Sequence, residues 1–513
     1  MSGNAVTQFI LDPADRDGDR IALIDGPTGA TTTRAQLATG AMKAAGALAT
    51  LGIKPEQRVM LIMADRPAFL EVFWGAIALG AVPVPISTML PTKDYRFLIH
   101  DSRAVAVVVS DVFAEQVLPA TSEQPFLEHI LIEGATQTAS STAPNAQTLS
   151  YAELHSAATE LPLFPNEAED TAFWLYTSGT TGFPKGALHR HGDMSFLTET
   201  YAKGVLNVTE DDRMYMVPKL FFAYGLGVNY FALGCGASHV LFDGRPTVEA
   251  VVDHVRRHQP TLFWAVPTFL SQLLSSDTAD DTFSSVRATV TGGETLPGDI
   301  GRRCLDRFGF AALDSIGSTE VGHIYIANTL EKQKPGSTGW AVDGFEVELR
   351  DPEGNLVPDG EPGELYVAGD SVTPGYWRRT EQNRTVFHGR FLATGDTFQR
   401  DDDGAYTYLG RGDDMIKAGG IWVSPAEVEA AIIEMPEVAL AAVVGAPDDE
   451  RLEKPKAFVL LEAGVVGDDT LAAKIQNHVR ERLAPFKYPR WVTFVDELPQ
   501  TATGKVKRYL LRE

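Results

Sequence analysis

The stretch from Thr177 to Gly186 constrains this chain more than any other. It reads Thr-Ser-Gly-Thr-Thr-Gly-Phe-Pro-Lys-Gly and directly follows the apolar and aromatic run 171–176, which predicts a strand. Its glycines let the backbone approach a ligand closely, its hydroxyls can donate to phosphate oxygens or bind a magnesium ion, and its lysine adds a positive point charge. The spacing does not fit the Walker A pattern. We therefore expect a different phosphate loop, with contacts from Thr177, Ser178, Gly179, Thr180, Thr181, Gly182 and Lys185.

Length and charge exclude several classes of protein. The chain has 513 residues, which is too long for one hydrophobic core, and its formal net charge is −24. This charge argues against a nucleic-acid partner. It leaves nucleotide binding open, because phosphates respond to local donors rather than to net charge. The two cysteines, Cys235 and Cys304, show no zinc-site spacing, so we expect no zinc site and a reducing, cytoplasmic location.

The stretch 72–92 carries no charge and is long enough to cross a bilayer. Glycines and prolines interrupt it, so we interpret it as the end of a helix over 67–79, a glycine turn and a strand over 82–86. The acidic N-terminus lacks the basic start and apolar run of a signal peptide. We expect no membrane partner.

Strand-like and helix-like segments alternate over the first half. The pattern predicts a mostly helical segment 31–51, a helix 67–79 and strands 58–63, 82–86 and 105–109, with a surface loop over 136–147. Such alternation indicates an α/β architecture with parallel sheets. From about residue 344, short strands at 346–350, 363–368 and 406–409 indicate a small β-rich subdomain.

The last hundred residues have an alternation of their own. They predict helices 426–433 and 471–483 and strands 439–444, 457–462 and 491–495. We therefore expect a large N-terminal α/β domain over 1–412, which includes the β-rich subdomain, and a small α+β C-terminal domain over 413–513.

Several short motifs carry a family resemblance. The loop at Thr177 resembles the phosphate loop of the adenylate-forming superfamily, which comprises acyl-CoA synthetases, adenylation domains and luciferases. Four more motifs occur in the order that this family has, namely Gly317-Ser318-Thr319-Glu320, Thr394-Gly395-Asp396, Gly410-Arg411-Gly412-Asp413-Asp414 and Pro499-Gln500-Thr501-Ala502-Thr503-Gly504-Lys505. Each motif is weak alone, but their common order makes chance negligible. The resemblance covers essentially the whole chain.

The resemblance implies a reaction in two steps. A carboxylate attacks the α-phosphate of ATP, and the thiol of coenzyme A then displaces AMP. The resemblance implies that Lys505 and Thr319 act on the reacting groups, with Glu320 and Thr180 as ligands of Mg²⁺. The implied nucleotide contacts are Gly293, Glu294, Thr295, Asp314, Ser315, Ile316, Gly317, Asp396 and Arg411. It further implies a hinge at Asp413, about which the small domain moves, and a coenzyme A tunnel at Lys417, Gly419 and Gly420.

The segment Pro218–Gly227 lies where this family has its acyl pocket. Its sequence, Pro-Lys-Leu-Phe-Phe-Ala-Tyr-Gly-Leu-Gly, is similar to that of benzoate–CoA ligase-type enzymes, and it contains no acid to pair with a substrate ammonium group. An α-amino acid is therefore disfavoured, whereas an aromatic wall suits a flat aryl carboxylic acid. The expected pocket residues are Phe222, Ala223, Tyr224, Gly225 and His323. His323 would hydrogen-bond a ring substituent or cap the pocket, and the ring substituents stay open.

Three other functions stay open at this point. An aryl-acid adenylation enzyme would load the phosphopantetheine arm of a carrier protein, which ends in the same thiol as coenzyme A. A nucleotide-binding module would lack catalysis, but the joint presence of Lys505, Glu320 and Asp396 argues against it. A luciferase-type oxygenase fits less well. We expect a monomer or a homodimer.

Overall fold

The computed structural model describes residues 3–134, 146–177, 184–412, 414–418, 421–448, 453–484, 487–500 and 506–512. The chain forms two compact units. Unit 1 contains residues 1–246, 317–324 and 369–387, and unit 2 contains 247–316, 325–368 and 388–513. Most of the predicted loop 136–147 lies outside the described residues.

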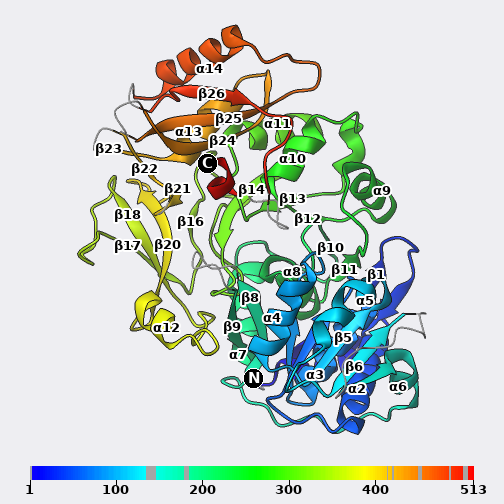
Figure 1. The fold of residues 1–513 in the computed structure, drawn as a ribbon. Coiled ribbons are helices and arrows are strands. Elements are labelled where there is room, and N and C mark those ends of the chain that lie inside the picture. The colour runs from blue at the N-terminus through cyan, green and yellow to red at the C-terminus, as the bar shows by residue number, and fades with distance from the viewer. Residues whose placement is uncertain are drawn as a thin grey trace. The chain divides into compact units, whose positions relative to one another are not determined.

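A parallel five-stranded sheet with helices on its faces confirms the predicted α/β architecture in unit 1 (Figure 1). Its strand order is β4 (Val82–Pro85), β3 (Arg58–Ile62), β5 (Ala106–Ser110), β6 (His129–Glu133) and β7 (Gln147–Ser150). Its helices are α2 (Arg34–Thr50), α3 (Pro67–Ala78), α4 (Thr92–Ser102), α5 (Asp111–Val117) and α6 (Tyr151–Ala157). Alternate strand residues such as Met60 and Val107 pack against α4 and α5 in one core.

Two details refine the predicted helices. The expected helix 31–51 begins only at Arg34, because Thr33 forms a capping box with Gln36 and a short strand β2 (Thr31–Thr33) precedes it. The uncharged stretch 72–92 forms the end of α3 and the strand β4, as expected. In the part of the chain that the structure describes, no helix is both long enough and apolar enough to span a membrane.

Unit 1 also contains a second group of strands and a hairpin. β10 (Arg213–Met216), β11 (Ser238–Leu241) and β1 (Ile21–Asp25) run parallel, and β2 pairs antiparallel with β1. The hairpin is β8 (Thr171–Thr177) and β9 (Lys185–Arg190). The remaining helices of this unit are η1 (Thr7–Leu11), α1 (Asp12–Asp17), η2 (Leu118–Thr121), α7 (His191–Leu197), η3 (Thr198–Lys203), α8 (Ala223–Cys235) and α12 (Thr380–Val386).

Unit 2 begins with parallel strands and continues into the predicted β-rich subdomain. β12 (Leu262–Ala265), β13 (Ala288–Thr291) and β14 (Ala311–Gly317) are parallel, and β15 (Ile324–Ala327) pairs antiparallel with β16 (Trp340–Ala341). The helices are α9 (Val248–His258), α10 (Pro267–Leu274), η4 (Asp280–Phe283) and α11 (Gly298–Phe308). The β-rich part has antiparallel β17 (Glu346–Arg350), β18 (Pro362–Ala368), β20 (Phe391–Arg400) and β21 (Tyr406–Arg411), and the short β19 (Phe387–His388) pairs with β20.

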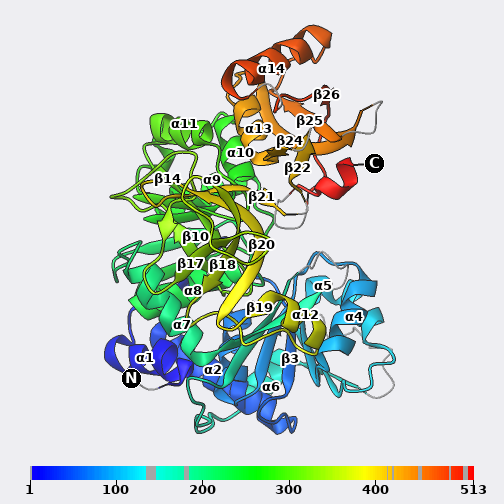
Figure 2. The ribbon, with the colours of Figure 1, turned by 90° about the vertical axis from the view of Figure 1, so that its left-hand side faces the viewer.

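The C-terminal part of unit 2 has the α+β character that the sequence predicts. The strands β24 (Val438–Pro447), β25 (Glu453–Leu461) and β26 (Trp491–Phe494) form one sheet, with α13 (Pro425–Ile433) and α14 (Asp469–Arg482) beside it (Figure 2). β22 (Ile416–Ala418) and β23 (Ile421–Val423) form a small hairpin before it, and η5 (Arg508–Leu511) ends the chain. Ala442, Val444, Leu498 and Leu511 form a core of its own.

Candidate active site

The predicted phosphate loop joins the two strands of the β8–β9 hairpin. Thr177 and Lys185 are register partners where the hairpin opens. The hairpin is anchored beside this point, because the Tyr176 hydroxyl donates to the buried Asp101 carboxylate at 2.8 Å. Burial beside this carboxylate raises the pKa of Tyr176 well above its usual value. The predicted contacts Ser178, Gly179, Thr180, Thr181 and Gly182 lie outside the described residues.

The second motif forms a tight turn, Gly317–His323, which we call the catalytic turn. The Ser318 N–H donates to the His323 carbonyl at 3.3 Å, and the Gly322 N–H donates to the Ser318 carbonyl at 3.0 Å. Gly322 has φ +87°, a conformation that favours glycine. A Cβ on Gly317 would lie only 2.4 Å from the His323 carbonyl oxygen. Both glycines are therefore required by the close approach of the backbone.

The structure brings Glu320 and Lys185 together through one aromatic residue, Tyr376. The Tyr376 hydroxyl donates to Glu320 Oε1 at 2.8 Å, and the Lys185 ammonium lies 4.7 Å from the centre of the Tyr376 ring. Tyr376 reaches this place because it bridges to Ala187 of β9. Sequence reasoning missed Tyr376, since a tyrosine 56 residues from Glu320 carries no local signal of this contact.

Two oxygens of the catalytic turn remain without a partner among the described residues. They are the Thr319 hydroxyl and Glu320 Oε2, both on half-buried residues. Hard oxygen ligands of this kind suit Mg²⁺, which keeps several waters and needs only one or two protein carboxylates. The absence of a cluster of three or more metal-ligating side chains among the described residues is compatible with such a site. The donor set at Glu320 therefore fits a magnesium ion.

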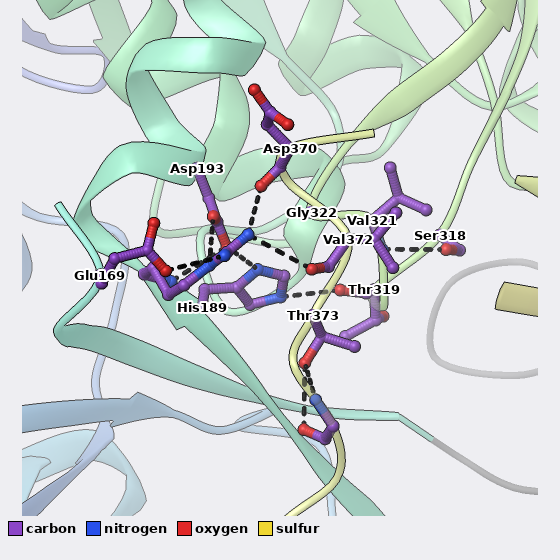
Figure 3. Close-up of polar contacts among 12 residues, drawn as sticks. Glu169, His189, Asp193, Ser318, Thr319, Val321, Gly322, Asp370, Val372 and Thr373 are labelled. Atoms are coloured by element: carbon purple, nitrogen blue, oxygen red, sulfur yellow. Dashed lines mark hydrogen bonds and ion pairs between the residues drawn. The ribbon is translucent and has the colours of Figure 1, made fainter. Parts of the chain in front are cut away.

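Hydrogen bonds from two other segments hold the backbone of the catalytic turn, and Figure 3 shows the one between His189 and Thr319. Nε2 of His189, on β9, lies 2.8 Å from the Thr319 carbonyl oxygen, and the Thr373 N–H donates to the Glu320 carbonyl at 2.8 Å. Neighbouring Arg190 bonds the carbonyls of Asp370 and Val372. The strand that leaves the phosphate loop thus fixes both segments.

The predicted adenine residues lie at the carboxyl ends of neighbouring parallel strands in unit 2. Thr291 at the end of β13 is the register partner of Asp314 in β14. In open parallel sheets this edge is where ligands bind. Burial raises the pKa of Asp314 well above its usual value, and Ser315 Oγ donates to the Thr291 carbonyl at 2.6 Å. Ile316 follows in β14. Residues 314–316 and the loop after β13 therefore lie at the same edge of the parallel sheet, the one formed by the carboxyl ends of the strands.

The loop after β13 contains Gly293, Glu294 and Thr295. Gly293 has φ +86°. The Glu294 carboxylate accepts hydrogen bonds from the backbone N–H and the hydroxyl of Thr268, at 3.2 and 2.7 Å, near the start of α10. The carboxylate of Glu294 is therefore engaged by the start of α10.

The predicted ribose residues are register partners on β20 and β21. Asp396 pairs with Arg411, and their side chains approach to 3.8 Å. The Arg411 guanidinium also donates to the Thr394 carbonyl at 3.2 Å. Gly395 has φ +74°, a left-handed conformation that explains the glycine between the threonine and the aspartate.

The acyl segment, Pro218–Gly227, leads into α8. Phe222, Ala223 and Tyr224 are half-buried, whereas Gly225 is buried. Only glycine fits at position 225, because a Cβ there would lie 2.2 Å from the Lys219 carbonyl oxygen. At the start of the segment, the Lys219 ammonium donates to the Phe242 and Gly244 carbonyls and lies 3.8 Å from the buried Asp65 carboxylate. Sequence reasoning missed this buried anchor.

His323 ends the catalytic turn and touches the acyl segment. Its Nε2 donates to the Tyr224 carbonyl at 3.2 Å, and the rings of Tyr201, Tyr224 and Phe231 surround it. His323 is 2% exposed, and burial lowers its pKa to about 3, so the ring is neutral at pH 7. Of the two expected roles, this buried position fits the one that caps the pocket from behind Tyr224.

The predicted hinge and tunnel lie partly outside the described residues. Asp413, Gly419, Gly420 and Lys505 belong to those parts, and Lys417 lies in β22. On either side of the last motif, Gln500 and Val506 form an antiparallel bridge. Arg508 then pairs with Glu429 of α13 at 2.8 Å, so the chain around this motif is tied to the C-terminal sheet and helix.

Known proteins resemble the chain over almost its whole length. The AMP-binding enzyme family matches residues 11–377, and the AMP-binding enzyme C-terminal domain matches residues 427–505. The benzoate–CoA ligase of Thauera aromatica is 41% identical over 466 residues, which cover 90% of this chain and 87% of that protein. The 4-hydroxybenzoate–CoA/benzoate–CoA ligase of Rhodopseudomonas palustris is 39% identical over 520 residues, which cover 99% and 94%.

A solved structure gives the same result for the fold. The crystal structure of the anthranilate CoA ligase AuaEII in complex with anthranoyl-AMP has a TM-score of 0.94 and 36% identity, and the match covers 99% of this chain and 96% of that one. This likeness agrees with the parallel sheets and the small C-terminal α+β part described above. The chain therefore belongs to the AMP-binding enzymes of the adenylate-forming superfamily, and within them to the benzoate–CoA ligase-like members.

Proposed function

We propose that this protein is an ATP-dependent ligase that joins an arylcarboxylate of the benzoate type to coenzyme A and releases AMP and pyrophosphate. One observation carries the proposal. His323, the last residue of the catalytic turn, bonds the Tyr224 carbonyl of the acyl segment. An aromatic acid held along Phe222 to Tyr224 would therefore have its carboxylate close to the turn that carries Thr319 and Glu320. The benzoate-type relatives support this substrate class.

The first half-reaction brings two anions together, so it requires positive charge and oriented donors. Lys185 and the hydroxyls of the phosphate loop would bind the phosphates of ATP, and the Thr319 hydroxyl would face the α-phosphate. Glu320 and Thr180 would hold a magnesium ion, which when bound neutralises phosphate charge. Lys505 would place its ammonium between the carboxylate and the α-phosphate.

The nucleotide and the acceptor thiol would use residues of unit 2. Gly293 to Thr295 and Asp314 to Ile316 would frame the adenine, and Asp396 with Arg411 would bind the ribose. We propose a small domain over 413–513 that turns about Asp413 between the half-reactions. Lys417, Gly419 and Gly420 would then line the path of coenzyme A. We further propose that the enzyme works in the cytoplasm as a monomer or homodimer.

The choice of acid substrate is the most specific part of the proposal. The acyl segment offers aromatic rings and no carboxylate, which favours a neutral aromatic ring over one with an ammonium group. The relatives named above act on benzoate and 4-hydroxybenzoate, and one solved relative is an anthranilate ligase. Benzoate and its hydroxy and amino derivatives are therefore the substrates to test first.

A panel assay tests this function. Purified protein with ATP and Mg²⁺ is given aryl and alkyl acids, and AMP release is measured with and without coenzyme A. We expect release that depends on an aryl acid and on coenzyme A, with the aryl-CoA thioester as product. A preference for alkanoates would reject the aryl pocket. Aryl-dependent AMP release that needs no coenzyme A would point to the loading of a carrier protein instead.

The lysine of the last motif separates the half-reactions. Lys505→Ala should lower adenylate formation at least about 100-fold, because one donor to the transition state is lost. It should spare thioester formation from preformed aryl-adenylate. Both rates are measured on the same preparation, and an equal loss in the two half-reactions would contradict the role of Lys505.

A further inference from the structure

One fully buried side chain touches the catalytic turn without being part of the proposed chemistry. His189 lies on β9, four residues after Lys185, and its side chain is 0% exposed. Its Nε2 is 2.8 Å from the Thr319 carbonyl oxygen. A carbonyl oxygen only accepts hydrogen bonds, so Nε2 is the donor. The contact therefore fixes the backbone of Thr319 rather than its hydroxyl.

The opposite edge of the ring faces the buried carboxylate of Asp193 (Figure 3). Nδ1 of His189 lies 3.4 Å from Asp193 Oδ2, in the first turn of α7, but has no hydrogen-bond partner among the described residues. The Arg190 backbone N–H and side-chain Nε hold this carboxylate at 2.9 and 3.0 Å. Phe173 stacks on the imidazole, with ring centres 4.9 Å apart. The direction of the Nε2 donor is thus set by the stacking on Phe173 and by the complete burial of the ring, and not by a hydrogen bond at Nδ1.

The catalytic turn packs closely against the His189 ring. Gly322 packs on it, and a Cβ there would lie 3.3 Å from His189 Cε1. The next carbonyl, that of Glu320, accepts the Thr373 N–H at 2.8 Å. With two successive carbonyls held, the peptide between Thr319 and Glu320 cannot rotate without breaking a hydrogen bond. The Thr319 hydroxyl and Glu320 Oε2, which have no partner among the described residues, belong to the two residues that this peptide joins.

We infer that His189, held in place by its stacking on Phe173, is a positioning residue for adenylate formation. It acts through the Thr319 carbonyl and sets the directions of the Thr319 hydroxyl and the Glu320 carboxylate. Groups that hold a ligating side chain in place affect activity strongly although they touch no substrate. The inference rests on the proposed role of Glu320.

Two substitutions separate the hydrogen bond from mere packing. The amide nitrogen of Gln sits near the position of Nε2, so His189→Gln can still donate to the Thr319 carbonyl. The shorter Asn places its amide near Nδ1, so His189→Asn can reach Asp193 but not Thr319. Both variants remove the ring and its stacking on Phe173, and only one removes the bond to the turn.

His191 provides a matched control. It lies two residues further along, is 1% exposed, and its Nδ1 accepts the Ala5 N–H at 3.0 Å. Neither the catalytic turn nor the acyl segment contacts it through a hydrogen bond in the described structure. His191→Asn and His191→Gln therefore report the effect of cutting back a buried histidine in the same region.

The decisive measurement is aryl-acid-dependent ATP–pyrophosphate exchange, with thioester formation from preformed adenylate measured alongside. We expect His189→Asn to lower the kcat of exchange about 10- to 100-fold, with KM for the acid and thioester formation close to wild type. His189→Gln should restore most of this kcat. Both His191 variants should keep the wild-type kcat of exchange, even if their melting temperatures fall.

A second readout needs no catalysis. The N–H groups of Val321 and Gly322 are bonded within the catalytic turn. In the nucleotide-free protein their hydrogen exchange should quicken in His189→Asn and stay slow in His189→Gln. Three results would overturn the inference: an equal loss of kcat in both His189 variants, a parallel loss of thioester formation, or unchanged hydrogen exchange of Val321 and Gly322 in His189→Asn.

The variant Glu320→Gln distinguishes a failure of the His189 inference from a failure of the proposed function. If Glu320→Gln retains full ATP–pyrophosphate exchange activity, the proposed role of Glu320 fails. The hydrogen-exchange measurement alone then decides whether His189 holds the turn. If Glu320→Gln is inactive and His189→Asn is fully active, the positioning role fails while the proposed function stands.

Discussion

The catalytic turn and the acyl segment meet at His323, yet they are held in different ways. In the turn, successive carbonyls accept hydrogen bonds from His189 and from the Thr373 N–H, and Tyr376 holds the Glu320 carboxylate. The acyl segment is anchored at its start by the half-buried Lys219 and the buried Asp65. Beyond this anchor, close packing shapes it. A Cβ on Gly227 would lie 2.1 Å from His323 Cδ2.

This difference separates chemistry from specificity. Hydrogen bonds to the backbone fix the turn whatever acid is bound, so the turn should serve every substrate alike. Packing of rings and glycines sets the shape of the acyl segment, and shape distinguishes one acid from another. Changes in the turn should therefore lower activity on all acids together, and changes in the acyl segment should alter the ratio between acids.

The largest effect is expected at the carboxylate of the turn. Glu320→Gln should lower adenylate formation about 100-fold or more, because a metal ion contributes several kcal/mol to stabilising charge in the transition state. The loss should be the same for benzoate and 4-hydroxybenzoate, as measured by pyrophosphate exchange at saturating acid. A loss confined to one acid would place Glu320 in the acyl pocket.

The next effect is expected in the acyl segment. Gly227→Ala adds a methyl group that must displace the His323 ring, so kcat/KM for benzoate should fall about tenfold. The ratio of kcat/KM between benzoate and 4-hydroxybenzoate should change as well. Steady-state kinetics with both acids measure this, and an unchanged ratio would show that His323 does not shape the pocket.

A similar or smaller effect is expected at Tyr376. Tyr376→Phe removes the hydrogen bond to Glu320 but keeps the ring beneath Lys185, so kcat should fall about tenfold or less. All acids should be affected equally, and more Mg²⁺ should be needed for half-maximal rate, which a magnesium titration measures. An unchanged magnesium requirement would count against this contact as a support of the metal site.

The smallest effect concerns the anchor of the acyl segment and its dependence on pH. Burial raises the pKa of Asp65 to about 6, above the value of about 3.9 that an unfolded chain has. The folded state therefore binds this proton more tightly, and the contribution is fully present below about pH 4 and lost as the pH rises through 6. Relative to Asp65→Asn, the wild-type protein should lose thermal stability between pH 4 and about 7. A difference that stays constant over this range would contradict the raised pKa.

The fold was predictable where a pattern is local. The alternation of strands and helices at 58–109 and the α+β pattern after 426 both correspond to observed elements. The start of α2 shifted from 31 to 34, because the capping box of Thr33 and Gln36 competes with the helical pattern upstream. Strand β2 is stabilised by antiparallel pairing with the nearby strand β1, so residues 31–33 leave the helical pattern for a local hairpin.

The candidate site was predictable only where the residues form motifs. Thr319, Glu320, Asp396 and Arg411 stand in short sequence patterns, and the structure pairs Asp396 with Arg411 in register. Tyr376, His189 and Asp65 act through contacts with residues far away in the sequence, such as the 130 residues between His189 and Thr319. Their roles depend on the tertiary fold, so no periodicity or spacing points to them.

One ratio tests the separation of chemistry from specificity most directly. It is kcat/KM for benzoate divided by kcat/KM for 4-hydroxybenzoate, measured for the wild type, Tyr376→Phe and Gly227→Ala in one assay. Tyr376→Phe should lower both values and leave the ratio unchanged, whereas Gly227→Ala should change the ratio. A ratio that shifts as much in Tyr376→Phe as in Gly227→Ala would contradict the account.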